Sequence, residues 1–448
     1  MKAFKAYDVR GVWKVEFDED TVYKIGYFIP SLLKADKVLV GRDMRLSSPV
    51  IHDQLVKGIL DSGASVIDIG LSTTPLVYFS NVHYQVKASL MITASHNGKE
   101  YNGLKISGEN AFPIGYETGL KELERLVGNG KVEKKPRGEV IDKRSEARSE
   151  YIRYLSEFIP SLDGFKIAID ASNGMASTIL KDIYGTTGRY YINDEPDGSF
   201  PVHDPNPLVR KNLDGLIELV KKTGSDVGMI FDGDADRVVF VDEKGNPVQP
   251  DYMTAILSLY YKRRNMTGKV VVDIRTSNST INALRENGFT PVLWKVGHAY
   301  ATEKIIKENA IFGGELAGHY YLAHEFFSAD GAILSSLLVM TVLKESGKSL
   351  SELISSIVRY SNSGEVNFQV GNKDEVISHL LEEYGKNADR IYDFDGYRIE
   401  YPTWWFNVRK SNTEPLLRIV VEAESESEME KHLEDIKSII NNFGSDKA

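Results

Sequence analysis

One pattern constrains the fold of this chain more than any other: short β-branched runs alternate with helical stretches, as in α/β units. Three times, a strand-like run ends in a polar loop that opens a helix, in the ranges 38–48, 167–177 and 270–280. Each time, a later strand-like run in the same region ends in a second polar loop, which is richer in charged and hydrogen-bonding side chains. We interpret this as one α/β layout used three times without strict sequence repetition. Since ligands of open α/β sheets bind beyond the carboxyl ends of strands, we expect the chemistry in those richer loops.

The pattern of apolar and polar residues changes after about residue 361. Residues 390–424 read as hairpin-like strands. A helical face follows, made of Met429, Leu433, Ile436 and Ile440. This predicts a small α+β domain after the three α/β domains. The predicted domains are residues 1–145, 146–247, 248–361 and 362–448.

Composition excludes several classes of protein. The chain has 448 residues and a net charge of −10, which argues against a nucleic-acid partner because such proteins usually present a basic face. It has no run of about 18 apolar residues, so no membrane span is expected, and its N-terminal MKAFKAYDVRG is not a signal peptide. The absence of cysteine excludes disulfides, thiolate metal sites and cysteine catalysis. We expect a cytoplasmic protein, and we interpret the charged segment 131–150 as a solvated linker or surface turn.

Three carboxylates follow one strand-like run at alternate positions, namely Asp232, Asp234 and Asp236, with glycine and alanine as spacers. Small spacers let the backbone curl so that all three carboxylates point inward, and hard divalent cations such as Mg²⁺ prefer oxygen ligands. Clustered carboxylates repel one another unless a cation is present, which argues against a plain acidic surface turn. Arg237 would lie beside such a metal, where it can hold a phosphate oxygen.

Another apolar run, residues 90–92, stops abruptly before Thr-Ala-Ser-His-Asn-Gly, which places Ser95 beside His96. A serine hydroxyl needs activation, and neither a Ser-His-Asp order nor a G-x-S-x-G elbow surrounds this one, so acyl transfer is not favoured. Phosphoryl transfer needs in-line positioning, a metal and nearby cations. Ser95 as a phosphate carrier would meet these needs, with His96 and Lys105 close enough in sequence to move protons. The alternative is a turn or helix N-cap serine.

Two further loops carry groups that suit a phosphosugar. Glu315 and His319 lie in a glycine-rich turn where they can bind sugar hydroxyls, and His298 is a candidate acid or base, although each of the three can also be structural. The last domain offers a guanidinium, two hydroxyls and an amide that suit a phosphate dianion, with a polar hairpin turn as the alternative. These groups belong to Arg409, Ser411, Asn412 and Thr413.

Together the loops resemble those of the α-D-phosphohexomutase superfamily, the phosphomannomutase/phosphoglucomutase enzymes. The resemblance spans essentially the whole chain, in the order YDVRG, TASHN, DGDADR, GELAGH and RKSNTEPLLR. It implies three α/β domains with mixed sheets and a smaller C-terminal α+β domain, heart-shaped around a central cleft. It also implies the interconversion of hexose 6-phosphate and hexose 1-phosphate, in which a phosphorylated serine gives a bound 1,6-bisphosphate and then recovers the other phosphate.

The resemblance also implies a role for each matching residue. The implied catalytic residues are Ser95 as phosphoserine, Lys105 and His298 for proton transfer, and Arg10 and Arg237 beside the transferred phosphate. The implied metal ligands are the phosphate of Ser95 with Asp232, Asp234 and Asp236. The implied substrate contacts are Glu315 and His319 on sugar hydroxyls, and Arg409, Ser411, Asn412 and Thr413 on the non-reacting phosphate. The implied cofactors are Mg²⁺ and a hexose 1,6-bisphosphate; the partner is a small-molecule phosphosugar, and the chain is a monomer or a homo-oligomer.

Two positions depart from the family pattern. Gly98 stands where many members have proline, and Ala317 stands where many have serine, next to Leu316 at the variable position. These differences concern the preferred sugar and not the reaction. Glucose, mannose and glucosamine phosphates differ at C2, which is a small target for discrimination.

Two other functions remain open at this point. A Mg²⁺-dependent sugar phosphatase would use Asp232 as its nucleophile and leave Ser95 dispensable, since Asp-x-Asp after a strand also occurs in haloacid-dehalogenase enzymes. A non-catalytic sugar-phosphate sensor would bind the same ligands without turnover.

Overall fold

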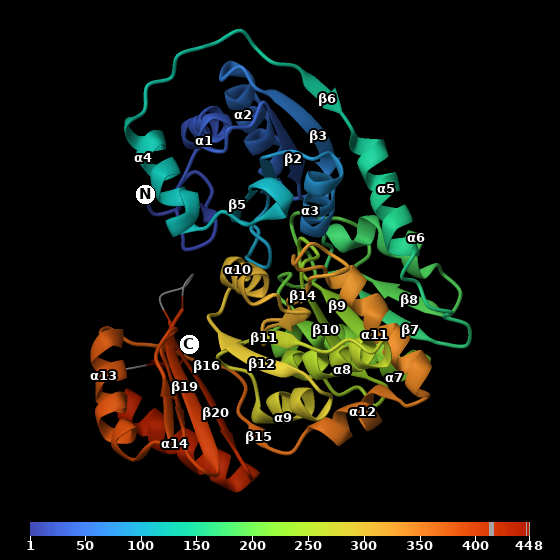
Figure 1. Cartoon of the computed structure of the whole chain (residues 1–448), viewed down its shortest axis with the longest axis vertical. Coiled ribbons are helices and arrows are strands. Elements are labelled where there is room, and N and C mark those ends of the chain that lie inside the picture. Colours follow the sequence, from blue (N-terminus) through green and yellow to red (C-terminus); the bar gives the residue numbers. More distant parts are fainter. Residues whose placement is uncertain (412–415, 445, 448) are drawn as a thin grey trace.

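The computed structural model describes residues 1–411, 416–444, 446 and 447. Four β-sheets follow one another along the chain (Figure 1). Residues from all four units line a central cleft. Three α/β units with mixed sheets come first, and a smaller unit with an antiparallel sheet comes last. This confirms the predicted fold class. No described helix combines the length and the apolar character that crossing a membrane requires.

The first three sheets share one four-stranded plan. Within this plan, the first strand pairs in parallel with the second and the third strands, and the third strand pairs antiparallel with the fourth. In chain order these strands are β2 Lys37–Arg42, β3 Ser65–Leu71, β4 Ser89–Ile92 and β5 Tyr101–Ser107; β7 Ile167–Asp170, β8 Arg189–Ile192, β9 Val227–Phe231 and β10 Val238–Asp242; and β11 Lys269–Asp273, β12 Thr290–Trp294, β13 Phe312–Gly314 and β14 Tyr320–Leu322. The predicted threefold layout is therefore correct. Each of the richer loops is the turn of the hairpin between the third and fourth strands.

Helices pack on these sheets, and the first sheet is extended at its edges by β1 Val9–Val12 and β6 Val140–Asp142. The helices of the first unit are α1 Glu19–Leu32, α2 Ser48–Asp61, α3 Thr74–His83 and α4 Lys121–Asn129. Those that follow are α5 Arg144–Ser156, α6 Leu180–Tyr184, α7 Asp214–Thr223, α8 Pro250–Arg263, α9 Asn278–Glu286, α10 His298–Glu308, α11 Ala332–Ser346 and α12 Leu350–Ile357.

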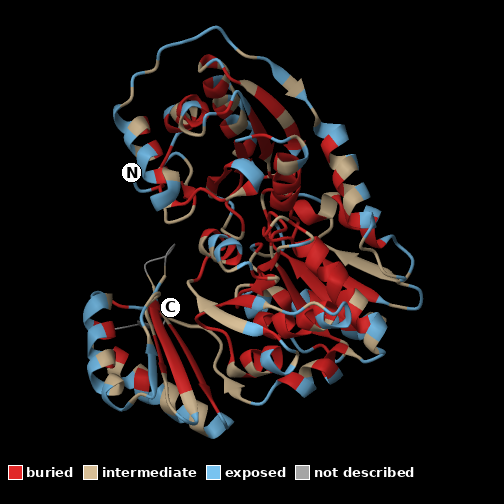
Figure 2. Cartoon of the chain, in the orientation of Figure 1, coloured by how far each residue is buried: buried red, intermediate tan, exposed pale blue. Residues whose placement is uncertain are grey.

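The first sheet separates two hydrophobic cores. Val38 and Val40 belong to a core that also contains residues of α1, α2 and α4, whereas Leu39 between them belongs to a cluster that continues through the second and third units. This alternation is the two-residue period of a strand covered on both faces. Helix α11 lies within the larger cluster, and it is apolar on all sides, as a fully surrounded helix must be. The buried residues accordingly run from the first unit into the third without interruption (Figure 2).

The charged segment 131–150 is only partly a linker. Residues 140–142 form β6, which pairs in parallel with β3, and α5 begins at Arg144. Ala147, Tyr151 and Leu155 of α5 are fully buried at a four-residue spacing. The linker interpretation of these residues was wrong because the charges between them hide that sparse apolar face. The exact domain boundaries stay predictions.

The fourth unit has a separate core. Its strands are β15 Ser361–Asn362, β16 Val366–Gln369, β17 Arg390–Tyr392, β18 Tyr397–Glu400, β19 Trp404–Lys410, β20 Leu417–Ala423 and β21 Asp446–Lys447, and its helices are α13 Lys373–Tyr384 and α14 Glu426–Asn441. Ile436 and Ile440 are fully buried against this sheet, and Met429 and Leu433 pack on the same cluster. The predicted apolar face of α14 is thus confirmed.

Candidate active site

The central cleft has a volume of about 630 Å³. Most of the predicted site residues line it, although they come from four units of the chain. The lining includes Arg10, Lys105, Arg237, His298, Glu315, His319, Arg409 and Ser411. Asn412 and Thr413 lie outside the described residues. Ser95, Asp232, Asp234 and Asp236 are fully buried next to the cleft, in contact with its lining residues.

The backbone of Ser95 has an unusual conformation. Its φ angle is 52°, in the left-handed region that residues other than glycine seldom adopt. The Ser95 amide donates to Thr93 Oγ1 at 2.9 Å, which holds the turn directly after β4. Hydrogen bonds therefore hold the loop after β4, and they fix the direction in which the Ser95 hydroxyl points.

Arg45, which sequence reasoning missed, clamps this loop. Its two terminal nitrogens donate to four backbone carbonyls, at 2.6–3.1 Å. The carbonyls belong to Ser95, Asn97, Gly98 and Tyr101. Its Nε pairs with Asp43 Oδ2 at 3.1 Å, and the ring of Phe200 lies 4.9 Å from the guanidinium. All five N–H groups of a buried arginine are thus satisfied, as burial of this charge requires.

The carboxylate loop meets the serine loop directly. The Ser95 hydroxyl donates to Asp232 Oδ2 at 3.0 Å, and Asp232 Oδ1 accepts from the amides of Asp236 and Arg237, both at 3.2 Å. These bonds curl the loop, with Ala235 at a φ of 61°. A Cβ at Gly233 would lie 2.5 Å from the carbonyl oxygen of Ser95, so only glycine permits this approach.

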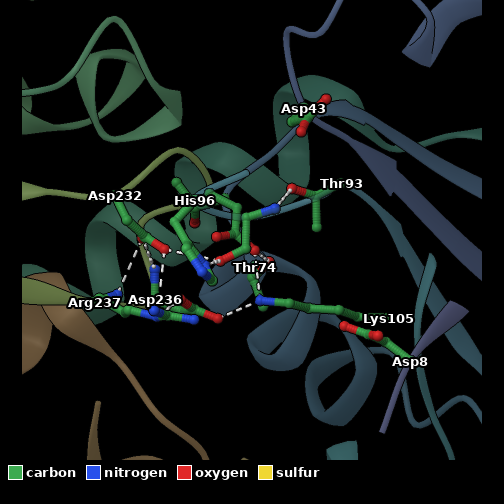
Figure 3. Close-up of polar contacts among 12 residues, drawn as sticks. Asp8, Asp43, Thr74, Thr93, His96, Lys105, Asp232, Asp236 and Arg237 are labelled. Atoms are coloured by element: carbon green, nitrogen blue, oxygen red, sulfur yellow. Dashed lines mark hydrogen bonds and ion pairs between the residues drawn. The ribbon is translucent and has the colours of Figure 1, made fainter. Parts of the chain in front are cut away.

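Lys105 of β5 points into the carboxylate cluster (Figure 3). Its ammonium lies 2.6 Å from Asp234 Oδ2 and also contacts Asp236 Oδ2, while Thr74 Oγ1 donates to Asp234 Oδ2 at 2.5 Å. Thr74 opens α3, whose N-cap is Thr73. The first unit therefore supplies both a cation and a hydroxyl to the acidic loop of the second.

The cluster offers ligand atoms that nothing in the described chain satisfies. Asp232, Asp234 and Asp236 each place a carboxylate oxygen within 4.8 Å of the others. Asp234 Oδ1 and Asp236 Oδ1 are buried and have no hydrogen-bond partner among the described residues. Buried anionic oxygens of this kind are costly unless a cation or a donor reaches them. The donor set, all carboxylate oxygen, suits a hard divalent cation.

The pKa values within this cluster diverge. Burial, together with the charges of Asp236 and Asp234, raises the pKa of Asp232 well above its usual range. Burial also disfavours the charge of Asp236, but Lys105, His319 and Arg237 outweigh it and lower the pKa of Asp236. The structure thus concentrates more negative charge here than its own cations neutralise.

Two arginines approach this acidic centre. The Nε of Arg237 lies 3.7 Å from Asp232 Oδ2 and 3.9 Å from Asp236 Oδ1. Arg10 pairs with Asp8 and donates to Asn97 Oδ1 at 3.0 Å. Both guanidiniums line the cleft, so an anion next to the Ser95 loop would meet two fixed positive charges.

The third unit supplies two histidines and a glutamate. His298 opens α10, and its ring centroid lies 6.5 Å from that of His319. Burial, with the nearby charges of Lys105 and His319, lowers the pKa of His298 well below its usual range. His319 Nδ1 lies 2.5 Å from Asp330 Oδ2, a partner that the sequence did not reveal. Glu315 Oε1 accepts from Tyr321 at 2.6 Å and from the amide of Gly297 at 3.2 Å.

The other end of the cleft is strongly basic. Arg409 is accompanied by two arginines that sequence reasoning missed, Arg275 and Arg418, and all three contact the carboxylate of Glu365 at 2.8–3.1 Å. Arg275 closely follows β11, in a polar loop that the sequence did identify as such. Nothing in the sequence indicated that residues so far apart would meet at one point.

Four family models match successive parts of the chain. Three are described as phosphoglucomutase/phosphomannomutase alpha/beta/alpha domains I, II and III, and they match residues 1–133, 149–245 and 249–360. The fourth, described as the phosphoglucomutase/phosphomannomutase C-terminal domain, matches residues 365–439.

Named relatives match over nearly the full length of the chain. A protein named "Phosphohexose mutases" from Xanthomonas campestris pv. campestris is 34% identical over 98% of this chain and 99% of its own. A phosphomannomutase of Escherichia coli is 34% identical over 94% of this chain and 95% of its own. The crystal structure of a phosphoglucomutase/phosphomannomutase family protein from Burkholderia thailandensis superimposes with a TM-score of 0.89 at 25% identity, covering 100% of this chain and 99% of that one.

Proposed function

The chain belongs to the phosphoglucomutase/phosphomannomutase family and is an intramolecular phosphotransferase of the isomerase class, and we propose that it interconverts hexose 6-phosphate and hexose 1-phosphate through a phosphorylated Ser95. The observation that carries this proposal is the direct contact of Ser95 Oγ with Asp232, at the meeting point of two loops from separate units. A serine in a cluster of three carboxylates is poorly placed for acyl transfer, but it suits a phosphate that shares a cation with those carboxylates.

The three carboxylates fit Mg²⁺, because two of their buried oxygens have no partner among the described residues. Asp232, Asp234 and Asp236 would hold the ion, together with an oxygen of the Ser95 phosphate. Bound there, Mg²⁺ would polarise the phosphoryl group and balance the charge that develops on it. Ser95 and these three aspartates are therefore the proposed metal-binding residues.

The proposed first transfer moves the phosphoryl group from Ser95 Oγ to a free hydroxyl of a bound hexose phosphate. The bond from phosphorus to Ser95 Oγ breaks as the bond to the sugar oxygen forms. The hydroxyl proton passes to His298, whose depressed pKa keeps it neutral and able to accept. Arg10 and Arg237 face the transferred group, and Lys105 is a proposed donor to the departing serine oxygen. The product of this step is a bound hexose 1,6-bisphosphate.

In the proposed second transfer the bisphosphate presents its other phosphate to Ser95. The bond from phosphorus to the sugar oxygen breaks as the bond to Ser95 Oγ forms, Lys105 takes back the serine proton, and His298 returns its proton to the sugar oxygen. Glu315 and His319 would hold sugar hydroxyls in either orientation. Arg409 and Ser411, with Asn412 and Thr413 outside the described residues, would hold the phosphate that is not reacting. One site must therefore accept either end of the sugar, so we propose that the fourth unit closes over the cleft as a lid.

The preferred sugar depends on few contacts. Leu316 lines the cleft and packs on Trp405 and Val420 of the fourth unit, while Ala317 lines the cleft without a hydroxyl of its own. Glucose and mannose phosphates differ only in the orientation of one hydroxyl, and glucosamine phosphate only in its C2 substituent. We propose broad use of glucose and mannose phosphates, extending to glucosamine phosphate.

A ³¹P NMR time course tests the proposal. The protein is mixed with Mg²⁺, trace glucose 1,6-bisphosphate and, in separate samples, glucose, mannose and glucosamine 1-phosphates. We expect 6-phosphate signals from the wild-type protein and none from Ser95→Ala. Ser80→Ala is the matched control, because the Ser80 hydroxyl is buried and has no hydrogen-bond partner among the described residues.

The same spectra separate the competing functions. Release of inorganic phosphate that is unaffected by Ser95→Ala would identify a phosphatase and move the nucleophile to Asp232. Binding without any new signal would identify a sensor. Either result would overturn the proposed phosphoserine mechanism.

A further inference from the structure

Glu365 is placed where a phosphate is proposed to bind. It immediately precedes β16 and lines the central cleft beside Arg409 and Ser411. Its Oε2 lies 2.8 Å from Arg275 Nη1 and 3.1 Å from Arg409 Nη2, and its Oε1 lies 3.1 Å from Arg418 Nη1. One carboxylate thus occupies a fork formed by three guanidiniums, much as a phosphate would.

The three arginines cannot easily spread apart. Arg409 and Arg418 are direct cross-strand partners on β19 and β20, an arrangement that is destabilising for like charges without an anion between them. Arg275 is held from the third unit by Asp273, at 2.7 Å from its Oδ2. The positive charges are therefore fixed in place by both units, and an anion has to be present among them.

Glu365 neutralises this cluster only in part. Burial disfavours its charge, but Arg275, Arg409 and Arg418 outweigh burial and lower the pKa of Glu365 to about 2. The carboxylate is therefore ionised at any working pH. Among the described residues, Glu365 and Asp273 are the carboxylates that contact these guanidiniums, so an arriving anion would meet both the attraction of the arginines and the repulsion of Glu365.

We propose that Glu365 is a positioning residue that keeps the arginine fork assembled when it is empty and limits how tightly it holds a phosphate. The inference rests on the proposed function, in which the bisphosphate must leave this clamp and turn round between the two transfers. Without Glu365, the three arginines would hold a phosphate dianion more strongly and slow that release. The negative charge of Glu365 lets the phosphate bind and leave within one turnover.

A purely structural role for Glu365 makes a different prediction. The carboxylate joins Arg275 of the third unit to Arg409 and Arg418 of the fourth, so its loss could simply loosen the contact between units. Glu400 provides a matched control. It pairs with Arg398 at 2.8 Å, and Arg398 donates to the carbonyls of Ile274 and Thr276 across the same contact.

Isothermal titration of the full-length protein with inorganic phosphate, without Mg²⁺ and at fixed ionic strength, tests the inference. Glu365→Gln is expected to bind phosphate at least about tenfold more tightly than wild type, because a nearby like charge is removed from a poorly screened site. Glu365→Asp, which draws the carboxylate back, should fall between the two. Glu400→Gln should match wild type, and adding Arg409→Gln should abolish the gain of Glu365→Gln.

Each outcome bears on the inference. If Glu365→Gln does not fold, tighter phosphate binding by Glu365→Asp supports it. Binding by the Gln or Asp variant that is equal to or weaker than wild type overturns it, as does tighter binding by Glu400→Gln. If none of these proteins binds phosphate, the clamp itself is absent, and this part of the proposed function falls with the inference.

Discussion

The two ends of the cleft carry clusters of opposite charge, each with one side chain of the other sign inside it. At one end, the carboxylates of Asp232, Asp234 and Asp236 form a cluster, and two of them, Asp234 and Asp236, contact the ammonium of Lys105. At the other, three guanidiniums surround the carboxylate of Glu365. Arg237 lies near the carboxylates of the first end, and Asp273 pairs with an arginine of the second.

This opposition shows how an enzyme can keep two charged sites ready without a ligand. Each cluster contains a resident side chain of the opposite sign, which limits repulsion inside the protein. The same side chain competes with the ligand that arrives, a cation for Lys105 and a phosphate for Glu365. The affinity of each end for its ligand is therefore the attraction of the cluster for that ligand minus the repulsion by the resident side chain.

The largest expected effect comes from weakening the acidic end. We expect Asp236→Asn to lower turnover by about 10³-fold, because a catalytic metal supplies several kcal/mol of charge stabilisation. The substitution conserves shape, so the melting temperature should change little. Steady-state rates over a Mg²⁺ titration give the measurement.

Asp214→Asn is the control for that change, since this aspartate is exposed and pairs with the exposed Arg210. An Asp236→Asn enzyme that kept its rate at saturating Mg²⁺ would show that the acidic end does not depend on all three carboxylates.

The next effect concerns the basic end. We expect Arg409→Gln to raise KM for hexose phosphates about 10- to 100-fold, since a hydrogen bond to a charged group contributes roughly 1.5–3 kcal/mol. The clamped phosphate is held alike before and during transfer, so kcat should change much less. Arg390→Gln, at an exposed position of the same sheet, serves as control. A fall in kcat with unchanged KM would contradict a clamp at this end.

A smaller effect should follow from removing the resident cation. Lys105→Met deletes a positive charge that contacts Asp234 and Asp236, so Mg²⁺ affinity should rise about tenfold by calorimetry. Turnover should fall, because Lys105 is also proposed to move a proton. Unchanged Mg²⁺ affinity in Lys105→Met would contradict the idea that Lys105 competes with the cation as Glu365 competes with the phosphate.

The last prediction contrasts Glu365 with a buried carboxylate that pairs with no cation among the described residues. Burial raises the pKa of Asp251 from 3.8 to about 7. The folded state then binds this proton more tightly than the unfolded state, so stability falls as pH rises from about 4 to about 7, with a slope approaching about 1.4 kcal/mol per pH unit.

Asp251→Asn should remove this pH-dependent contribution to stability. Denaturant unfolding at several pH values compares the two proteins, and the stability of the variant relative to wild type should increase across this range. A difference that does not vary with pH would show that Asp251 is ionised when buried.

The fold was predictable because its signals are local. Apolar runs such as residues 227–231 and the polar loops after them can be read directly, and their threefold recurrence predicted three similar units. The helical face through Ile436 and Ile440 was equally clear. The start of α5 was missed because its buried residues are separated by charged ones.

The site was predictable only in part, and the missed residues share a physical reason. Arg45 acts on a loop about 50 residues away, and Glu365 meets arginines 90 and 44 residues distant. A long-range contact leaves no periodicity in the sequence. The left-handed backbone of Ser95 likewise had no signal, because it is imposed by Arg45 and Thr93 and not by serine itself.

The continuous core of the first three units has a consequence for synthesis on the ribosome. One buried cluster contains Leu39 and Leu343, so it is completed only by a helix made some 300 residues after the earliest strands. Until α11 emerges, the apolar surfaces of α8 and β10 that it contacts are exposed to chaperones and to other nascent chains. The fourth unit, with a core of its own, can complete its folding after the rest has closed.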